Sequence, residues 1–417
     1  MSIALSNSMT VSNTKGTFVK SLENILVLDL THMLSGPYGA MLLSDLGARA
    51  IKVESPISGE GTRQLLATSP EYSRQGMGAY FLTLNRGKES VCIDLKSDAG
   101  REVFYDLVRK ADVVFDNFSV GVTKRLKIDH ETLAAINPRI VTCSVSGFGE
   151  TGPEPTRPAF DSVVQGMGGG MSITGFPGGE PVRSGIPIGD LGGGMFGALG
   201  ILAALIARGK NGRGQHVDVS MLDVQISLLN YMATMYLMSG IVPEPMGNAH
   251  FVHVPYNVFR TQTGYIIIAC IGDAFYEKFL EVIPRPELRQ EKYKKQPGRY
   301  AERDLINRII QEELLANTSE YWLEKLRAAR IPCGPVNDFK QALRDPQIVA
   351  RNMVVNVQLQ TGETVSMPGN PIKLSEAGEE VFSPPPLLGE HTDAVLKDLL
   401  GYDAERIAPL KAAGIIQ

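Results

Sequence analysis

The strongest constraint on the fold is an alternation of strand-like and helix-like patterns in the N-terminal part of the chain. Residues 25–29 (ILVLD) and 49–54 (RAIKVE) are strand-like runs, and residues 38–46 between them have a helical pattern opened by Gly36 and Pro37. This order predicts a βαβ unit. Further strand patterns occupy residues 90–95, 112–115 and 139–146, with an amphipathic segment at 100–111. Strands that alternate with helices predict an α/β fold with a mostly parallel sheet covered on both faces.

The second half of the chain has a different organisation. Residues 215–219 predict one more strand, and residues 221–238 a long helix leading away from the sheet. A hairpin pattern with Gly264 at its turn follows at 256–270, and charged helical segments lie at 276–283, 302–315 and 319–329. We therefore expect a flexible lead-in (1–20), a large domain (21–218), a smaller α+β domain (219–330) and a return to the large domain (331–417).

Composition excludes several partners. The 417 residues carry a formal net charge of −4, and the basic residues are spread along the chain, which argues against a nucleic-acid partner. The four cysteines lie far apart, so we expect free thiols in a reducing, cytoplasmic compartment. Residues 191–207 form an uncharged apolar run, but a membrane span needs about 20 residues. We therefore expect residues 191–207 to form a buried core helix, and we expect no membrane as a partner.

Two familiar site motifs are not supported. Residues 147–152 fit the pattern GxGxxG of dinucleotide-binding loops, but Pro153, Pro155 and Pro158 follow at once. That pattern needs a helix whose first turn faces the pyrophosphate, so a tight loop is predicted instead. The six histidines show no HExxH arrangement, and no metal site is predicted.

Glycine-dense stretches at 166–170 and 192–194 leave two interpretations open. Glycine lets the backbone approach a ligand and direct N–H groups at negative charge, but it also permits turns and close helix packing. Asp161, just before the first stretch, is either a catalytic carboxylate or the cap of a helix beginning at Ser162, and local evidence alone favours the cap. Asp190 has a similar alternative as the cap of the apolar helix.

Seven segments, in this order and spacing, together resemble the class III CoA-transferase family, also called the CaiB/BaiF family. They are residues 28–37 (LDLTHMLSGP), 46–54 (LGARAIKVE), 85–90 (NRGKES), 116–118 (DNF), 146–153 (SGFGETGP), 212–215 (GRGQ) and 388–392 (LGEHT). The resemblance extends from about residue 22 to the end of the chain. It implies an interlocked homodimer with a Rossmann-like large domain made from both ends of the sequence.

The resemblance also implies a mechanism. The Asp161 carboxylate attacks an acyl-CoA thioester to form a mixed anhydride, and the released thiolate converts it to an aspartyl-CoA thioester. An acceptor carboxylic acid then takes over the CoA. Acyl-CoA and the acid are substrates, and no tightly bound cofactor or metal is implied. Backbone amides of Gly168, Gly169 and Gly170 would stabilise the oxyanions.

Coenzyme A contacts carried over from the family fall on ten positions. One of them is Arg125, whose guanidinium can stack on adenine or pair with phosphate. The alternative for Arg125 is a solvent-exposed charge on a helix. The positions are His32, Met33, Leu34, Ser35, Asp94, Leu95, Lys96, Asn117, Phe118 and Arg125.

Related racemases use the same aspartate as an acid and base, usually with a histidine before it. Phe160 stands there in this chain, which favours transfer. Residues 247–256 (GNAHFVHVPY) are most similar to enzymes that transfer CoA from succinyl-CoA to another dicarboxylate. His250, His253 or Arg183 would then bind the second carboxylate. Three functions stay open, namely a CoA-transferase, a 2-methylacyl-CoA racemase and a CoA-binding protein without catalysis.

Overall fold

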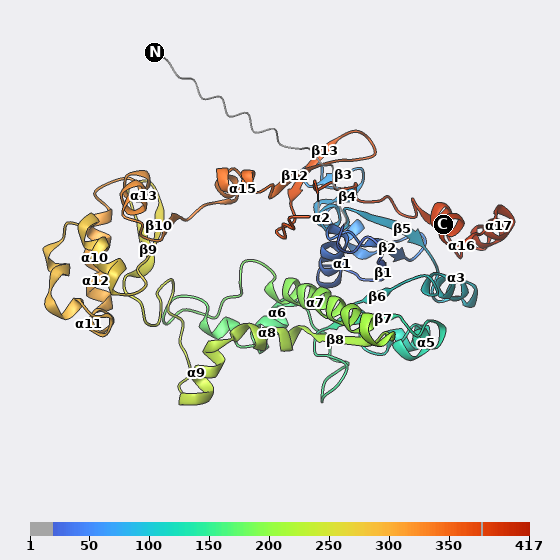
Figure 1. The fold of residues 1–417 in the computed structure, drawn as a ribbon, viewed down its shortest axis with the longest axis horizontal. Helices are drawn as coiled ribbons and strands as arrows, with labels where there is room; N and C mark the ends of the chain where they lie inside the picture. Colours follow the sequence, from blue (N-terminus) through green and yellow to red (C-terminus); the bar gives the residue numbers. More distant parts are fainter. Residues whose placement is uncertain (1–19, 377) are drawn as a thin grey trace, which may run out of the picture. The chain divides into compact units, whose positions relative to one another are not determined.

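The chain forms two compact units in a computed structural model that describes residues 20–376 and 378–417 (Figure 1). The first unit takes in residues up to 150 together with 193–219 and 355–417, and the second takes in 151–192 and 220–354. The predicted N-terminal lead-in, residues 1–20, lies outside the described residues except for Lys20.

The first unit is built on a six-stranded sheet with the order β5-β2-β1-β6-β7-β8. β1 pairs in parallel with β2 on one side and with β6 on the other, so that Leu28 lies opposite both Ile51 and Val114. The β2–β5 and β6–β7 pairs are also parallel, which confirms the predicted parallel sheet. The strands are β1 (Leu26–Asp29), β2 (Arg49–Glu54), β5 (Lys88–Cys92), β6 (Val113–Asp116), β7 (Val141–Ser146) and β8 (His216–Ser220).

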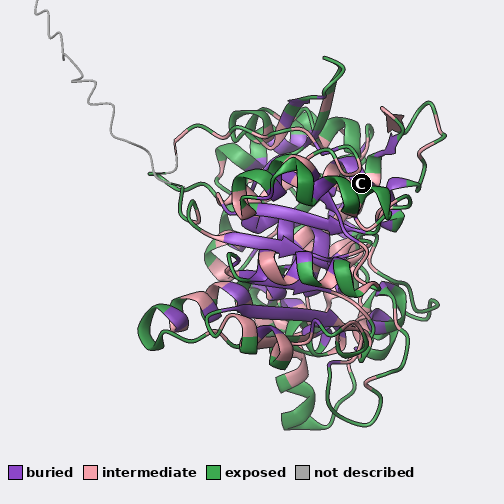
Figure 2. Ribbon diagram, turned by 90° about the vertical axis from the view of Figure 1, so that its right-hand side faces the viewer, coloured by how far each residue is buried: buried purple, intermediate pink, exposed green. Residues whose placement is uncertain are grey.

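Helices bury both faces of this sheet, whose strands are mostly buried in Figure 2. Alternate residues of β1, β2 and β6 share one core with helices from both ends of the chain. The C-terminus is tied to the sheet, since Asp94 N–H donates to Ile415 C=O at 2.8 Å. The helices of that face are α3 (Asp98–Val108), α5 (His130–Ile136), α16 (Thr392–Leu400) and α17 (Ala404–Ala412).

Helices α1 (Ser35–Asp45) and α7 (Ile188–Asn211) approach the sheet through glycines. A Cβ atom added at Gly194 would lie 2.2 Å from the carbonyl oxygen of Ser35, and one at Gly197 would lie 2.9 Å from the Phe115 ring. By length and composition, α7 is the one helix of the described residues apolar enough to cross a membrane. Glycines of α7 pack within the first unit, but Leu199 and Ile206 are 60% and 66% exposed, so the prediction of a buried core helix is confirmed only in part.

Short elements complete the first unit and include two small hairpins. They are the 3₁₀ turn η1 (Gly61–Arg63), α2 (Ala79–Leu84), α4 (Val122–Leu126), the pair β3 (Ser73–Arg74) and β4 (Met77–Gly78), and the pair β12 (Val354–Gln358) and β13 (Thr364–Pro368).

The second unit carries a three-stranded antiparallel sheet with the order β11-β10-β9 and its own apolar core. The predicted hairpin is confirmed as β9 and β10, which turn at Gly264. The buried Arg299 side chain fastens this core by donating to the carbonyl oxygens of Val254 and Tyr293. The strands are β9 (Tyr256–Arg260), β10 (Tyr265–Ala269) and β11 (Cys333–Pro335).

Three helices of the second unit, α10, α12 and α13, confirm the predicted charged segments, and further helical elements accompany them. In chain order, the helical elements of this unit are α6 (Asp161–Met167), η2 (Gly170–Ile173), α8 (Met221–Leu229), α9 (Tyr231–Ser239), α10 (Asp273–Val282), η3 (Pro286–Arg289), η4 (Glu291–Tyr293), α11 (Gln296–Ala301), α12 (Arg303–Leu314), α13 (Ser319–Ala328), α14 (Phe339–Ala342) and α15 (Pro346–Ala350).

One predicted element was wrong in its continuity. The helix expected over 221–238 is two helices, because Asn230 between α8 and α9 has φ 49° and ψ −125°, which no helix accommodates. The hydrophobic pattern runs through the break and conceals it.

Residues 333–335, expected in the return to the large domain, instead form β11 beside β10.

Candidate functional site

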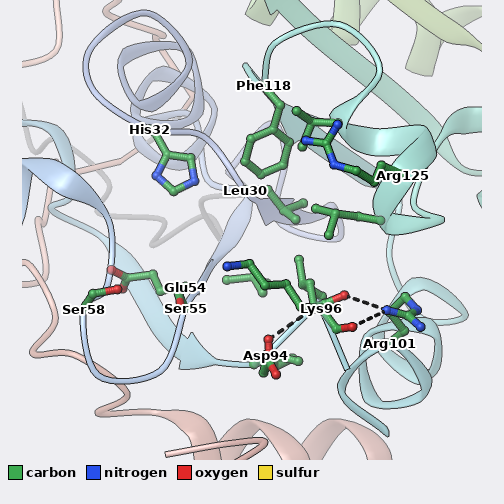
Figure 3. Close-up of a pocket in the computed structure, with 15 residues that line it drawn as sticks. Leu30, His32, Glu54, Ser55, Ser58, Asp94, Lys96, Arg101, Phe118 and Arg125 are labelled. Carbon is green, nitrogen blue, oxygen red and sulfur yellow. Dashed lines mark hydrogen bonds between the residues drawn. The ribbon is translucent and has the colours of Figure 1, made fainter. Parts of the chain in front are cut away.

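A cavity of about 670 Å³ lies at the carboxyl ends of parallel strands in the first unit (Figure 3). The strand order reverses between β1 and β6, and ligands of open parallel sheets bind at such a point. The lining comes from segments that follow β1, β2, β5 and β6. It comprises Leu30, His32, Val53, Glu54, Ser55, Ser58, Ile93, Asp94, Leu95, Lys96, Arg101, Phe118, Val122, Arg125 and Leu126.

A buried charge cluster holds the loop between β1 and α1, which contributes to this cavity. Lys52 Nζ donates to the Thr31 carbonyl at 2.8 Å, and Lys88 Nζ donates to Asp29 Oδ2 at 2.8 Å and to the Pro37 carbonyl at 3.1 Å. Burial by itself would raise the pKa of Asp29, but the two ammonium groups lower it to about 2. Both ends of the loop are therefore bonded to charged groups inside the sheet.

His32 is held from the neighbouring β6 segment. The Asn117 side chain accepts the His32 N–H and donates to the His32 carbonyl, both at 2.7 Å. The His32 and Phe118 rings lie 5.4 Å apart. Burial, with Lys52 adding to it, lowers the pKa of His32 to about 4, so its ring is neutral at physiological pH.

Three cationic side chains, those of Lys96, Arg101 and Arg125, line the cavity, and Figure 3 shows the two arginines on one side and the Lys96 side chain extending toward the middle. Arg101 Nη1 donates to the carbonyl oxygens of Leu95 and Lys96 at 3.1 and 2.8 Å. Asp94 Oδ1 accepts the N–H of Lys96 at 3.0 Å. The lining thus combines aromatic and apolar surface with positive charge, which suits a nucleotide with phosphates.

The structure brings together six of the ten positions expected to contact coenzyme A: His32, Asp94, Leu95, Lys96, Phe118 and Arg125 line one cavity. The other four do not line it. Asn117 supports the His32 backbone, and Met33 N–H donates to Glu60 Oε2 at 3.1 Å. Ser35 is buried at the start of α1, next to Leu34.

Asp161 is the first residue of α6 in the second unit, and it is 8% exposed. Its Oδ1 accepts the backbone N–H groups of Gly189 and Asp190 at 2.8 and 3.3 Å. Its Oδ2 accepts Nε2 of Gln165 at 2.7 Å. Every one of these hydrogen bonds comes from a neutral donor.

The interpretation of Asp161 as the cap of its own helix is wrong. Phe160, not Asp161, is the N-cap of α6, and it makes no side-chain cap bond. Asp161 instead receives the first-turn N–H groups of α7, far along the sequence, where a negative charge is favourable. Asp190 lies within that first turn, so it is not the cap of α7 that the sequence suggested.

Asp190 is a second carboxyl near Asp161. Burial, and after it the charge of Asp161, raises the pKa of Asp190 to about 6. The Asp190 carboxyl therefore binds a proton at a higher pH than an ordinary aspartate does.

Two of the glycine amides expected at the oxyanion site are already bonded. Gly168 N–H donates to the Val164 carbonyl at 2.8 Å, and Gly169 N–H donates to the Gly166 carbonyl at 3.5 Å. Gly168 also lets α6 approach α8, because an added Cβ would lie 2.4 Å from Cβ of Gln225. These glycines serve helix termination and packing in this structure, and Gly170 begins η2.

The residues expected to bind a second carboxylate also lie in the second unit. His250 Nδ1 accepts the N–H groups of Val252 and His253, and the two imidazole rings are 4.7 Å apart. Arg183 is exposed and donates to the carbonyl of Ser184 at 3.1 Å. Among the described residues, no group of three or more metal-binding side chains lies together.

Comparison with known proteins adds an observation independent of this geometry. The model of CoA-transferase family III matches residues 22–392. The chain belongs to the class III CoA-transferase family. Over 399 residues this CoA-transferase is 39% identical to acetyl-CoA:oxalate CoA-transferase of Acetobacter aceti, covering 95% of this chain and 99% of the relative.

Two further relatives extend the comparison. Human succinyl-CoA:glutarate CoA-transferase is 33% identical, covering 95% of this chain and 90% of the relative. The crystal structure of a CAIB/BAIF family protein from Brucella suis superposes with a TM-score of 0.82 at 36% identity, covering 91% of this chain and 99% of that one. The recognised family and enzyme class are therefore confirmed.

Two residues of these sites, Gln165 and Arg101, were not identified from the sequence. Gln165 is four positions after Asp161 on one helix, which is a detectable spacing, but its role depends on which side chains α7 brings near. Arg101 lines the cavity from a helix that reads as ordinary amphipathic surface. Neither residue is recognisable without the fold.

Proposed function

We propose that this CoA-transferase moves CoA from a donor thioester to a carboxylic acid through the carboxylate of Asp161. The observation that carries the proposal is the environment of that carboxylate. It is buried, hydrogen-bonded by three neutral donors and adjacent to a second acidic residue, Asp190. A carboxylate without a bonded cation keeps its charge available for attack on a thioester carbonyl.

Coenzyme A is proposed to bind the cavity of the first unit. Phe118 and Arg125 offer a flat ring and a guanidinium for the adenine, and Lys96 and Arg101 offer positive charge for the phosphates. No tightly bound cofactor is needed, because the thioester itself carries the activated acyl group.

The acceptor is proposed to be a dicarboxylate, with succinyl-CoA as the donor. Two of the named relatives act on oxalate and glutarate, and a third, from Haloarcula hispanica, is a succinyl-CoA:mesaconate CoA-transferase 36% identical to this chain. All three acceptors carry a second carboxylate. His250, His253 and Arg183 are the proposed partners for that group in this protein.

Racemisation of 2-methylacyl-CoA is the second candidate, and Phe160 weighs against it. A racemase needs a proton carrier on each side of the α-carbon. Phe160 is 72% exposed, carries no titratable group and precedes Asp161 directly.

The deciding experiment incubates the protein with succinyl-CoA and, separately, with oxalate, glutarate and mesaconate, and follows new thioesters by mass spectrometry. Asp161→Asn is expected to lose turnover by at least about 10³-fold while keeping CoA affinity. Asp304→Asn, at an exposed position of α12, is the matched control. Near-normal turnover in Asp161→Asn would refute the mechanism. Deuterium exchange at the α-carbon without CoA exchange would establish the racemase instead.

The assembly and the domain roles are proposals of the same kind. We expect an interlocked homodimer in the cytoplasm, with the first unit as the CoA-binding domain and the second unit as the smaller domain. Residues 151–192 and 331–354, which the sequence placed in the large domain, belong to the second unit. Light scattering of the purified chain tests the dimer.

A further inference from the structure

The two oxygens of Asp161 are held by donors of different kinds. Oδ1 accepts two backbone N–H groups, from Gly189 at 2.8 Å and Asp190 at 3.3 Å. Oδ2 accepts a single side-chain donor, Nε2 of Gln165, at 2.7 Å. The carboxylate is therefore asymmetric before any substrate arrives.

The Gln165 amide is fixed in one orientation. Its Oε1 accepts the backbone N–H of Ser184 at 2.9 Å, which leaves Nε2 directed at Asp161. The side chain is 3% exposed and lies one helical turn after Asp161 on α6, so water does not compete for its donor. Such an amide can set the rotation of the carboxylate plane.

The donors on Oδ1 are equally well fixed, because they belong to the first turn of α7. A Cβ atom added at Gly189 would lie 3.0 Å from Asp161 Oδ1 and 2.7 Å from a methyl group of Val164. Glycine at this position thus lets the helix terminus approach the carboxylate. The N–H groups of this turn have no carbonyl partner within α7, so they are free to bind charge.

We propose that Gln165 positions Oδ2 of Asp161 as the attacking atom, and that the N–H groups of Gly189 and Asp190 stabilise the oxyanion that forms on Oδ1. This assignment rests on the transfer mechanism proposed above. It places an oxyanion site on the nucleophile itself and assigns it to the start of α7 rather than to the glycines at 168–170.

The reaction begins with acylation of Oδ2 and continues with attacks on Cγ of Asp161. Oδ2 forms a bond to the acyl carbon, the carbon–sulfur bond of the thioester breaks, and CoA leaves as the thiolate. The thiolate then attacks Cγ of Asp161, and the electron pair of the Cγ–Oδ1 double bond moves onto Oδ1. Collapse breaks the Cγ–Oδ2 bond, and the donor acid leaves as a carboxylate that carries Oδ2. The acceptor carboxylate then attacks the same Cγ, which again places charge on Oδ1, and CoA leaves as the thiolate. The thiolate attacks the acyl carbon of the acceptor, the bond from that carbon to the bridging oxygen breaks, and the Asp161 carboxylate is released with one oxygen from the acceptor.

The donors to Oδ1 and Oδ2 of Asp161 differ in the same way as the change in negative charge on the two oxygens during the reaction. Oδ2 loses its charge on acylation and becomes a bridging oxygen, so its bond from Gln165 weakens as the reaction proceeds. Oδ1 gains charge at every attack on Cγ, so its two bonds strengthen in the transition state. Only the second kind of interaction accelerates the chemical step, whereas the first determines which atom attacks.

The first test compares Gln165→Met, which removes the donor at similar volume, with Gln165→Glu. Gln165→Met is expected to lower kcat about 10- to 100-fold with little change in KM for acyl-CoA, because misorientation of a reacting group costs this much. Gln165→Glu places two carboxylates together at pH 8 and is expected to be worse. At pH 5.5 the introduced carboxyl takes up a proton that it can donate to Asp161, so its rate relative to the wild type should recover about tenfold.

The wild type, measured over the same pH range, accounts for titration of the neighbouring Asp190. A purely structural role of Gln165 would give both variants the same loss at both pH values, along with a lower melting temperature. That result, or a Gln165→Met rate within about threefold of the wild type, overturns the positioning role.

The second test addresses the backbone donors with Asp190→Pro and Asp190→Ala. Both variants lack the carboxylate, but only proline lacks the N–H group, and the first turn of a helix tolerates proline. Formation of the aspartyl-CoA thioester from acyl-CoA alone, followed by intact mass, is expected to be about 10- to 100-fold slower in Asp190→Pro than in Asp190→Ala. Equal rates overturn the oxyanion assignment. If Asp190→Pro also loses CoA affinity, the proline has disturbed more than the N–H group. The comparison of Gln165→Met with Gln165→Glu then decides the proposal.

These outcomes are distinct from failure of the proposed function. A wild-type protein that forms neither an aspartyl-CoA adduct nor a new thioester refutes transfer altogether. A wild type that transfers CoA, together with fully active Gln165 variants, refutes only the division of roles.

Discussion

Replacement of Asp29 by asparagine is expected to destabilise the first unit more than any surface substitution. The Asp29 side chain has no exposed surface, and its Oδ2 lies 2.8 Å from Lys88 Nζ and 3.8 Å from Lys52 Nζ, both also fully buried. The Asp29 pKa is lowered from 3.8 to about 2, so the ionised carboxylate stabilises the folded state at neutral pH by an amount on the order of 2–3 kcal/mol. The variant additionally leaves two buried ammonium groups without their anion, and breaking such a pair costs about 3–5 kcal/mol.

Urea unfolding at pH 7, followed by circular dichroism at fixed protein concentration, measures this loss. Because the chain has two compact units, hydrogen exchange of the peptides covering β1 and β5 assigns the transition to the first unit. Asp304→Asn is the control, since Asp304 is 94% exposed and lies 3.7 Å from its arginine partner. Such a pair contributes about 0–1 kcal/mol.

A loss below about 1 kcal/mol in Asp29→Asn would refute the reasoning, because it would mean that the two lysines do not depend on this carboxylate for their burial. Unfolding at acidic pH provides a second check, namely on the direction in which stability changes with pH. The Asp29 pKa is lowered on folding, so its contribution is present above about pH 4 and is lost as the pH falls toward 2.

Two further predictions concern pH and packing. Burial raises the pKa of Asp116 to about 7, so stability should fall as the pH rises from about 4 through 7, and Asp116→Asn should flatten that part of the curve; an unchanged pH dependence in the variant would contradict this. Gly168→Ala should cost about 1–3 kcal/mol, because the new Cβ would lie 2.4 Å from Cβ of Gln225, whereas Gly209→Ala on α7 meets no atom within 4 Å and should be neutral or stabilising. Thermal unfolding compares the two glycine variants, and equal effects would contradict the packing argument.

Local pattern was sufficient for most of the elements. The strand at 49–54 has the bounds expected from its sequence, and the hairpin around Gly264 forms as its turn residue indicates. Strands buried on both faces are continuous apolar runs, and this signal does not depend on distant residues. The break at Asn230 could not be predicted in the same way, because hydrophobic periodicity continues across it and only the backbone conformation interrupts the helix.

For the candidate sites, too, some features follow from the sequence and others only from the tertiary structure. The sequence by itself identified the family, through seven motifs in a fixed order, and six of the positions carried over from that resemblance line one cavity. The catalytic role of Asp161 stays a prediction. Only the tertiary structure decided what surrounds Asp161. The helix terminus that receives its charge begins 27 residues later, at Ile188, and Gln165 acquires its orientation from Ser184 on another segment. Hydrogen bonds between residues far apart in sequence follow from how helices pack, and no local pattern encodes them.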